Sequence, residues 1–163
     1  MNGELDLMCS KPNKRPQITE EMRMQASVKM VARMVHAGLF QKHETDGFAD
    51  DICAATKRER HDGYKIAREL EERHHWECDF SIADSLEEFG GILDAIHRDA
   101  EKKWAEENPM TPLPEGSVVF WNGSLGTVHG VCPYRPHCYK FRNDETKGPE
   151  SYFVVPFEDV VPT

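Results

Sequence analysis

Residues 108–116 read NPMTPLPEG and place three prolines within nine positions. Proline has no backbone N–H and clashes with the preceding turn, so a helix cannot continue through this stretch. Upstream of it, apolar residues recur at helical spacing; downstream, SVVFW, GTVHGV, CYKF and SYFVVPF are short β-rich runs between turn-forming residues. The chain is therefore predicted to be α+β, with an N-terminal part of about four helices followed by a small antiparallel β-barrel-like part.

The same change of pattern sets the predicted domain limits. The first sixteen residues are polar and Pro-containing without periodicity, which is typical of a flexible arm. We therefore expect a flexible arm over 1–16, a helical domain over 17–108, a Pro-rich linker over 109–116 and a small β domain over 117–163.

Capping residues mark several helix ends. Thr19 can cap a helix whose natural stop is Gly38. Further helices are predicted over about 46–58 and 62–73. Ser81 followed by Asp84 resembles a capping box for the next helix, and the pair Gly90–Gly91 either breaks that helix or only weakens it.

The β part contains two recognisable turns. Asn122–Gly123 is a strong hairpin signal. In VCPYRPHCYKF, the prolines at 133 and 136 favour a strand, a fixed turn and a second strand. The aromatic and basic residues at and after this turn are candidates for contact with a partner: Tyr134, Arg135, Tyr139 and Lys140.

Acidic residues are concentrated in one segment. The whole chain has a formal charge of −9, and residues 69–107 alone contribute −9, with 13 Asp/Glu against 4 Lys/Arg. Such a field repels nucleic acid and attracts basic proteins, although a solvated helix face would show the same pattern. The predicted partner-binding carboxylates lie in rows at helical spacing: Glu69, Glu72, Asp84, Glu87, Glu88, Asp94, Asp99 and Glu101.

Neither membrane insertion nor export is expected. No apolar run approaches the ~20 residues needed to cross a bilayer, and the first residues have no apolar core of signal-peptide length. A cytoplasmic location is therefore predicted, where thiols stay reduced. The five cysteines (Cys9, Cys53, Cys78, Cys132 and Cys138) are an odd number at irregular spacing, which argues against a disulfide framework.

Two stretches resemble short uncharacterised proteins encoded by phages and prophages. They are DGYKIARELEERHHWECDFSIADSLEEF (residues 62–89) and GTVHGVCPYRPHCYKFRND…YFVVPFEDVVP (residues 126–162), the latter resembling Src-homology and KOW barrels more distantly. The resemblance defines no catalytic residue. It implies a mobile genetic element in a bacterial host cell, where many small phage proteins inhibit or redirect host machinery by binding it.

Metal binding is weakly supported near the second turn. His129, Cys132, His137 and Cys138 lie within ten residues, but neighbouring strand residues point to opposite faces, so His137 and Cys138 do not form a pair. We predict no metal site and no cofactor here, while metal binding by His129, Cys132 and Cys138 stays open. A disulfide between Cys132 and Cys138 is sterically possible across a hairpin.

A metal-dependent phosphohydrolase is a further alternative. It would use His61–Asp62, one upstream histidine (His36 or His43) and one downstream aspartate (Asp79, Asp84 or Asp94), which must converge. Asp62 instead suits a helix cap, and the surroundings are polar. No nucleophile motif or phosphate-binding glycine loop is present, so no catalytic residue is assigned.

The leading hypothesis is a non-enzymatic binding protein. Its acidic helical surface would inhibit or redirect a basic, nucleic-acid-handling host protein, for example a CRISPR or other defence nuclease complex. The first alternative is a nucleic-acid-binding module that stacks bases on the aromatic residues of the β part, although that part has a charge of −2.

Overall fold

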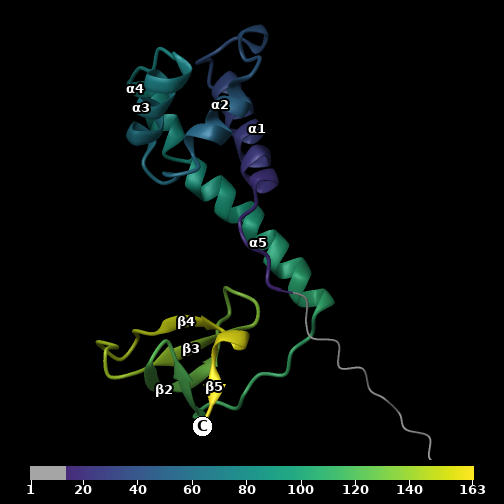
Figure 1. The fold of residues 1–163 in the computed structure, drawn as a ribbon, viewed down its shortest axis with the longest axis vertical. Coiled ribbons are helices and arrows are strands. Elements are labelled where there is room, and N and C mark those ends of the chain that lie inside the picture. The colour runs from purple at the N-terminus through teal and green to yellow at the C-terminus, as the bar shows by residue number, and fades with distance from the viewer. Residues whose placement is uncertain (1–13) are drawn as a thin grey trace, which may run out of the picture. The chain divides into compact units, whose positions relative to one another are not determined.

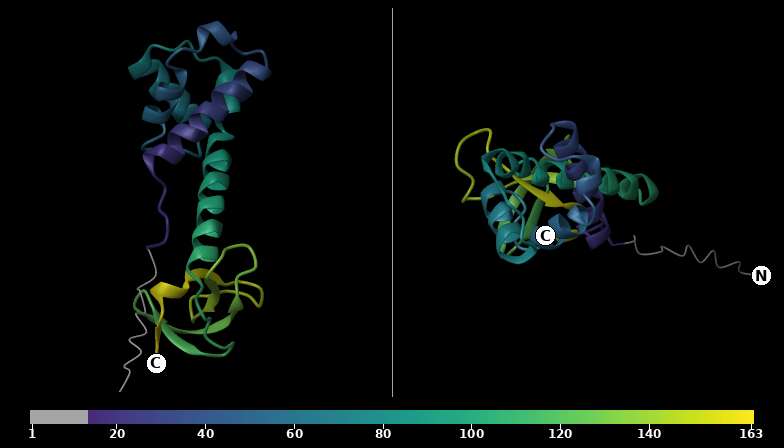
Figure 2. Two further views of the ribbon diagram at one scale, coloured as in Figure 1. Left: turned by 90° about the vertical axis from the view of Figure 1, so that its right-hand side faces the viewer. Right: turned by 90° about the horizontal axis from the view of Figure 1, so that it is seen from above.

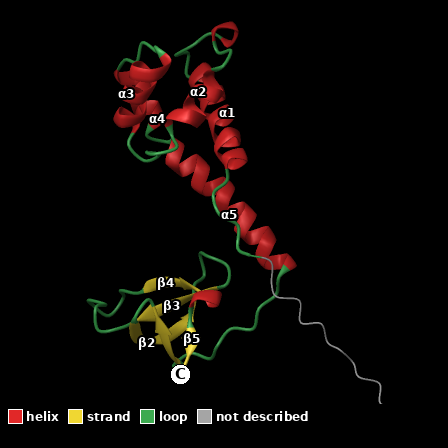
Figure 3. Ribbon diagram, in the orientation of Figure 1, coloured by secondary structure: helices red, strands yellow, loops and turns green. Residues whose placement is uncertain are grey.

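The fold consists of helices followed by one sheet (Figures 1 and 3). A computed structural model describes residues 14–163. Within these residues the α+β order is confirmed, with five α-helices before five strands. The helices are α1 (Glu20–His36), α2 (Phe48–Ala55), α3 (Gly63–His74), α4 (Phe80–Leu86) and α5 (Phe89–Glu107), with a 3₁₀ turn at Lys42–Glu44. The strands are β1 (Val118–Trp121), β2 (Ser124–Val131), β3 (Cys138–Arg142), β4 (Phe153–Pro156) and β5 (Val161–Pro162), with a 3₁₀ turn at Phe157–Asp159.

The chain forms two compact units. The helical unit comprises Pro16–Ala100, and the sheet unit comprises Glu101–Thr163 together with Arg15. The boundary thus lies within α5 and not at the predicted linker, because Glu101 and Trp104 are buried in the sheet unit. Most of the predicted arm, residues 1–13, lies outside the described part of the chain; Arg15, in contrast to the prediction, is a buried residue.

Local capping sets the ends of α1 as predicted. The Thr19 hydroxyl accepts a hydrogen bond from the Met22 N–H at 3.2 Å. At the other end, Gly38 has φ +77°, and the N–H groups of Gly38 and Leu39 return to carbonyls of the last turn. A residue with a side chain is strained in this left-handed conformation, so glycine ends the helix here.

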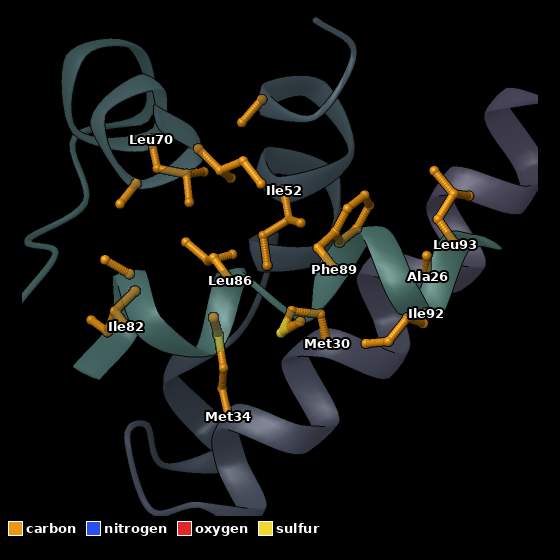
Figure 4. Close-up of a cluster of buried hydrophobic side chains, with 14 residues drawn as sticks. Ala26, Met30, Met34, Ile52, Leu70, Ile82, Leu86, Phe89, Ile92 and Leu93 are labelled. Atoms are coloured by element: carbon orange, nitrogen blue, oxygen red, sulfur yellow. The ribbon is translucent and has the colours of Figure 1, made fainter. Parts of the chain in front are cut away.

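The helical unit is held together by one apolar core (Figure 4). Met30 and Met34 of α1 reach toward Leu86 and Phe89, and all four side chains are almost fully buried. The unbranched methionines fill irregular space between the helices. The core also contains Ile52, Ile66, Leu70, Ile82 and Leu93, which join α2, α3, α4 and α5 to α1.

Two predictions about the middle helices need correction. Asp79, not Ser81, caps α4, because its side chain accepts a hydrogen bond from the Ile82 N–H at 3.0 Å. The break between α4 and α5 precedes the glycine pair, which lies in the first turn of α5. Gly90 is needed there for close approach, since a Cβ would lie 2.7 Å from the Arg60 carbonyl oxygen.

The sheet unit contains an antiparallel sheet with strand order β4-β3-β2-β1-β5. Figure 2 shows these strands from two further directions. Asn122 and Gly123, with φ of +46° and +81°, form the predicted tight turn between β1 and β2. β4 and β5 are the two edges, so the sheet is not closed into a barrel, and a barrel-like form stays a prediction.

The two faces of the sheet differ in exposure. One face carries the buried core of the unit, which includes Val119, Val128, Tyr139, Phe141 and Val155. On the other face, Phe120 is paired with Leu125 of β2 and with Val161 of β5, and all three are exposed. The sheet therefore buries one apolar face and presents apolar side chains on part of the other.

Candidate functional site

Half of the predicted partner-binding carboxylates are already paired within the helical unit. These pairs are exposed or half-buried, so each contributes little to stability. Each arginine offsets the charge of its carboxylate and so reduces the negative field at that position. The pairs are Glu69 with Arg73 (2.7 Å), Glu72 with Arg68 (2.8 Å), Asp94 with Arg60 (3.8 Å) and Glu88 with Arg33.

Three predicted carboxylates remain free for a partner. Asp84 of α4, Glu87 between α4 and α5, and Asp99 of α5 are exposed and form no ion pair with any residue in the described range 14–163. They belong to the segment that carries the acidic excess of the chain. They are therefore the strongest part of the predicted acidic helical surface.

Glu101 does not belong to that surface. Its side chain is 0% exposed and lies in the sheet unit, between the guanidinium groups of Arg135 and Arg15. Arg135 donates to both carboxylate oxygens, at 2.9 and 3.1 Å, and Arg15 approaches Oε1 at 3.4 Å. The prediction was wrong for this residue because its helical position says nothing about cations 86 residues upstream and 34 downstream.

Arg15 joins Glu101 to a second carboxylate. Its Nε donates to Glu158 Oε1 at 2.6 Å, and its Nη2 donates to Glu158 Oε2 at 3.2 Å. The guanidinium also lies 4.8 Å from the ring centroid of Trp104, a cation–π contact. We call Arg15, Glu101, Arg135 and Glu158 the charged cluster of the sheet unit.

The charged cluster predicts acid sensitivity. Burial alone would raise the pKa of Glu158, but the hydrogen bond and charge of Arg15 lower it below its ordinary value of 4.5. A lowered pKa stabilises the fold above the unfolded-state value, and this stabilisation is lost as pH falls through the folded-state pKa. We therefore expect urea titrations to show unfolding free energy falling below pH 4.5, and Glu158→Gln to reduce that slope. A slope unchanged by Glu158→Gln, or reduced equally by the exposed control Glu150→Gln, would contradict this.

The predicted contact residues of the β part have different surroundings. Tyr134 is 81% exposed at the tip of the turn. Arg135 is held by Glu101, and the Lys140 ammonium lies 5.3 Å from the ring centroid of Tyr152. Tyr139 is buried, stacks on Phe157 at 4.1 Å and accepts a hydrogen bond from the Leu113 N–H, so its predicted exposure was wrong. Because it is buried, Tyr139 cannot stack on a base, so the nucleic-acid alternative loses one of the aromatic residues that it would use.

The cysteines near the second turn are buried thiols. Cys132 and Cys138 are opposite each other, and the Cys132 N–H donates to the Cys138 carbonyl at 2.7 Å, whereas His129 is exposed. Burial raises the pKa of Cys138 to about 11, against the opposing effect of Arg15 and Arg135. Both are free thiols.

The residues proposed for a phosphohydrolase have local structural roles. Asp62 caps α3 through a 3.0 Å bond from the Lys65 N–H, and Asp79 caps α4. His61 is exposed and accepts a hydrogen bond from its neighbour Arg60. Across residues 14–163, His, Cys, Asp and Glu side chains do not gather in a group of three that could hold a metal ion.

The structure reveals a groove that the sequence analysis missed. It lies between α3 and α4 in the helical unit and has a volume of about 470 Å³. We call it the α3–α4 groove. Tyr64 and Phe80 are exposed at its wall, with ring centroids 5.9 Å apart in an edge-to-face arrangement. Its other lining residues are Ala67, Arg68, Glu71, Glu72, Cys78, Asp79 and Ala83.

Residue spacing along one helix could not have revealed this groove, because its two aromatic residues are sixteen positions apart on different helices. The available signal was that each aromatic residue is followed at helical spacing by charged residues: Arg68 and Glu71 after Tyr64, and Asp84 and Glu87 after Phe80.

None of the helices within the described residues is both long enough and apolar enough to cross a bilayer. Comparison with protein-family models, curated proteins and solved structures found no match.

Proposed function

We propose that this protein is a non-enzymatic binding protein whose acidic helical surface binds a basic, nucleic-acid-handling protein of a bacterial host. Inhibition or redirection of a defence nuclease complex, such as a CRISPR effector, is the activity that fits this partner. The proposal places the protein in the cytoplasm of the host cell, in the setting of a mobile genetic element. The surface of the partner that it would bind normally holds nucleic acid, and such a surface carries Lys and Arg.

A single observation supports the proposal most. Asp84, Glu87 and Asp99 are exposed carboxylates that form no ion pair with a described residue, within the segment that carries the acidic excess. Carboxylates in this state keep their full field in solution and accelerate association with a basic surface. Such steering weakens as salt is raised, because screening shortens the range of the field.

Charge reversal tests this proposal. The tagged protein would be used to capture partners from bacterial extract at low salt, with identification by mass spectrometry. We expect a basic, nucleic-acid-handling protein that is lost with the double variant Asp84→Lys/Glu87→Lys. The matched control is Glu145→Lys/Glu150→Lys, which makes the same charge change at exposed sites of the sheet unit.

The control must retain the partner that the test variant loses. Recovery of no basic partner at low salt, or equal recovery by the test variant and the control, would refute the proposed function. All four substituted side chains are exposed, so both double variants should stay folded. A loss of capture can therefore be attributed to the change of charge.

A further inference from the structure

The α3–α4 groove combines apolar walls with an acidic rim. Phe80 is 70% exposed and Tyr64 is 49% exposed, although both are large aromatic side chains. Contiguous exposed apolar side chains rimmed by polar residues are typical of interaction sites. The groove lies entirely within the helical unit, between α3 and α4.

Beside these rings, α3 packs closely against α4. At Gly63, an added Cβ would lie 2.2 Å from the Ala83 carbonyl oxygen and 2.6 Å from the Glu87 nitrogen. The two backbones therefore meet directly at the start of α3. The groove opens beside this contact, where Ala67 and Ala83 supply only methyl groups to its floor.

The rim of the groove favours a cation. Arg68 lies on the rim but is paired with Glu72 at 2.8 Å. Glu71 is exposed and forms no ion pair with any residue from 14 to 163. Glu71 and Asp79 both line the groove, as does Cys78. Burial and the charges of these two carboxylates raise the pKa of Cys78 to about 11.

The backbone around the groove favours a helical occupant. An extended segment normally gains affinity by hydrogen bonding to the edge of a sheet. Here both walls are helices, α3 and α4, so the groove offers no sheet edge to pair with. A bound segment must therefore satisfy its own backbone, and a helix does this while offering side chains on one face.

We propose that the α3–α4 groove binds an amphipathic helix of a protein partner, which packs an aliphatic or aromatic side chain against Tyr64 and Phe80 and places a Lys or Arg against Glu71 and Asp79. This inference rests on the proposed function and specifies the partner's chemistry: a basic surface alone is insufficient, and an apolar side chain must accompany the charge. A nucleic acid is a poor occupant because the rim is acidic.

Defined peptides test this inference without knowledge of the partner. The probe is a fluorescein-labelled, 15-residue amphipathic Leu/Lys helix, measured by fluorescence anisotropy at ~0.15 M salt. A Ser/Lys peptide of equal length and charge and a Leu/Glu peptide are the comparisons. We expect the Leu/Lys peptide to bind, the Ser/Lys peptide to bind more weakly, and the Leu/Glu peptide not to bind.

Variants then locate the binding site. Phe80→Ala should weaken Leu/Lys binding about tenfold, because a central aromatic contact is lost. Tyr134→Ala, which removes an exposed aromatic residue outside the groove, should leave it unchanged. Glu71→Gln should weaken binding about threefold, as expected for a partly exposed ion pair, whereas the nearby Glu77→Gln should not.

The outcomes separate this inference from the proposed function. If Leu/Lys binding is equal for Phe80→Ala and Tyr134→Ala, or if the Ser/Lys peptide binds equally well, the groove inference is wrong. Capture that depends on Asp84 and Glu87 would still support the proposed function in that case. Conversely, groove binding with capture unaffected by charge reversal would overturn the function and leave the groove supported. Both Phe80 and Glu71 are exposed, so their substitution leaves the core intact.

Discussion

Replacing Glu101 by alanine should lower the unfolding free energy of the sheet unit by about 1.5–3 kcal/mol, as expected when hydrogen bonds between charged groups are lost. Arg135 would lose its carboxylate partner, and Arg15, which stays buried, would keep only Glu158. The cost exceeds that of a surface salt bridge because the Glu101 side chain is 0% exposed. Urea unfolding followed by tryptophan fluorescence measures this loss, with Trp104 and Trp121 as reporters in the sheet unit.

The matched control for Glu101 is Glu106→Ala, which removes an exposed carboxylate five residues later in the same helix. We expect Glu106→Ala to change stability by no more than about 0.5 kcal/mol. If both variants shifted the urea midpoint equally, Glu101 would have no special role, and the charged cluster would not stabilise the sheet unit.

The second large effect is expected from Gly63→Ala. The new Cβ would lie 2.2 and 2.6 Å from main-chain atoms of Ala83 and Glu87, which cannot rotate away. The start of α3 must therefore move from α4, and overpacking of this kind costs about 1–3 kcal/mol. Thermal unfolding followed by circular dichroism at 222 nm measures the loss, because the helical unit contributes most of the helix signal.

Gly91→Ala provides the opposite expectation for the same chemical change. Gly91 lies in α5, and no atom comes within 4 Å of a Cβ built there. Alanine is the better helix former, so this variant should be stabilised by up to about 1 kcal/mol. A Gly63→Ala protein as stable as Gly91→Ala would show that the contact between α3 and α4 is not tight.

Much of the fold could be predicted from local signals. Thr19 and Gly38 end α1 through hydrogen bonds within a few residues of themselves. Asn122–Gly123 forms its turn for the same reason, since positive φ is a property of these two residues. Met30 and Met34 recur at helical spacing in α1, and both lie in the core. Signals of this kind are contained within one or two turns of the chain.

The helix boundaries around residues 79–91 were less predictable. Both Asp79 and Ser81 can cap a helix, and the choice depends on which residue leaves Ile82 and Leu86 facing the core. The sequence also offered Gly90–Gly91 as the break, whereas the chain breaks before Phe89, whose ring is fully buried. Core packing decided between alternatives of similar local energy.

The candidate site divides in the same way. The amino-acid sequence was enough to show that the carboxylates are concentrated in residues 69–107. The structure was needed to show that Asp84, Glu87 and Asp99 are exposed whereas Glu101, predicted on the same grounds, is buried. It was needed also to bring Tyr64 and Phe80 together in one groove. Helical spacing describes one element, whereas burial of a charge requires cations such as Arg15 and Arg135 brought from distant positions, and a groove requires two elements whose packing leaves a gap.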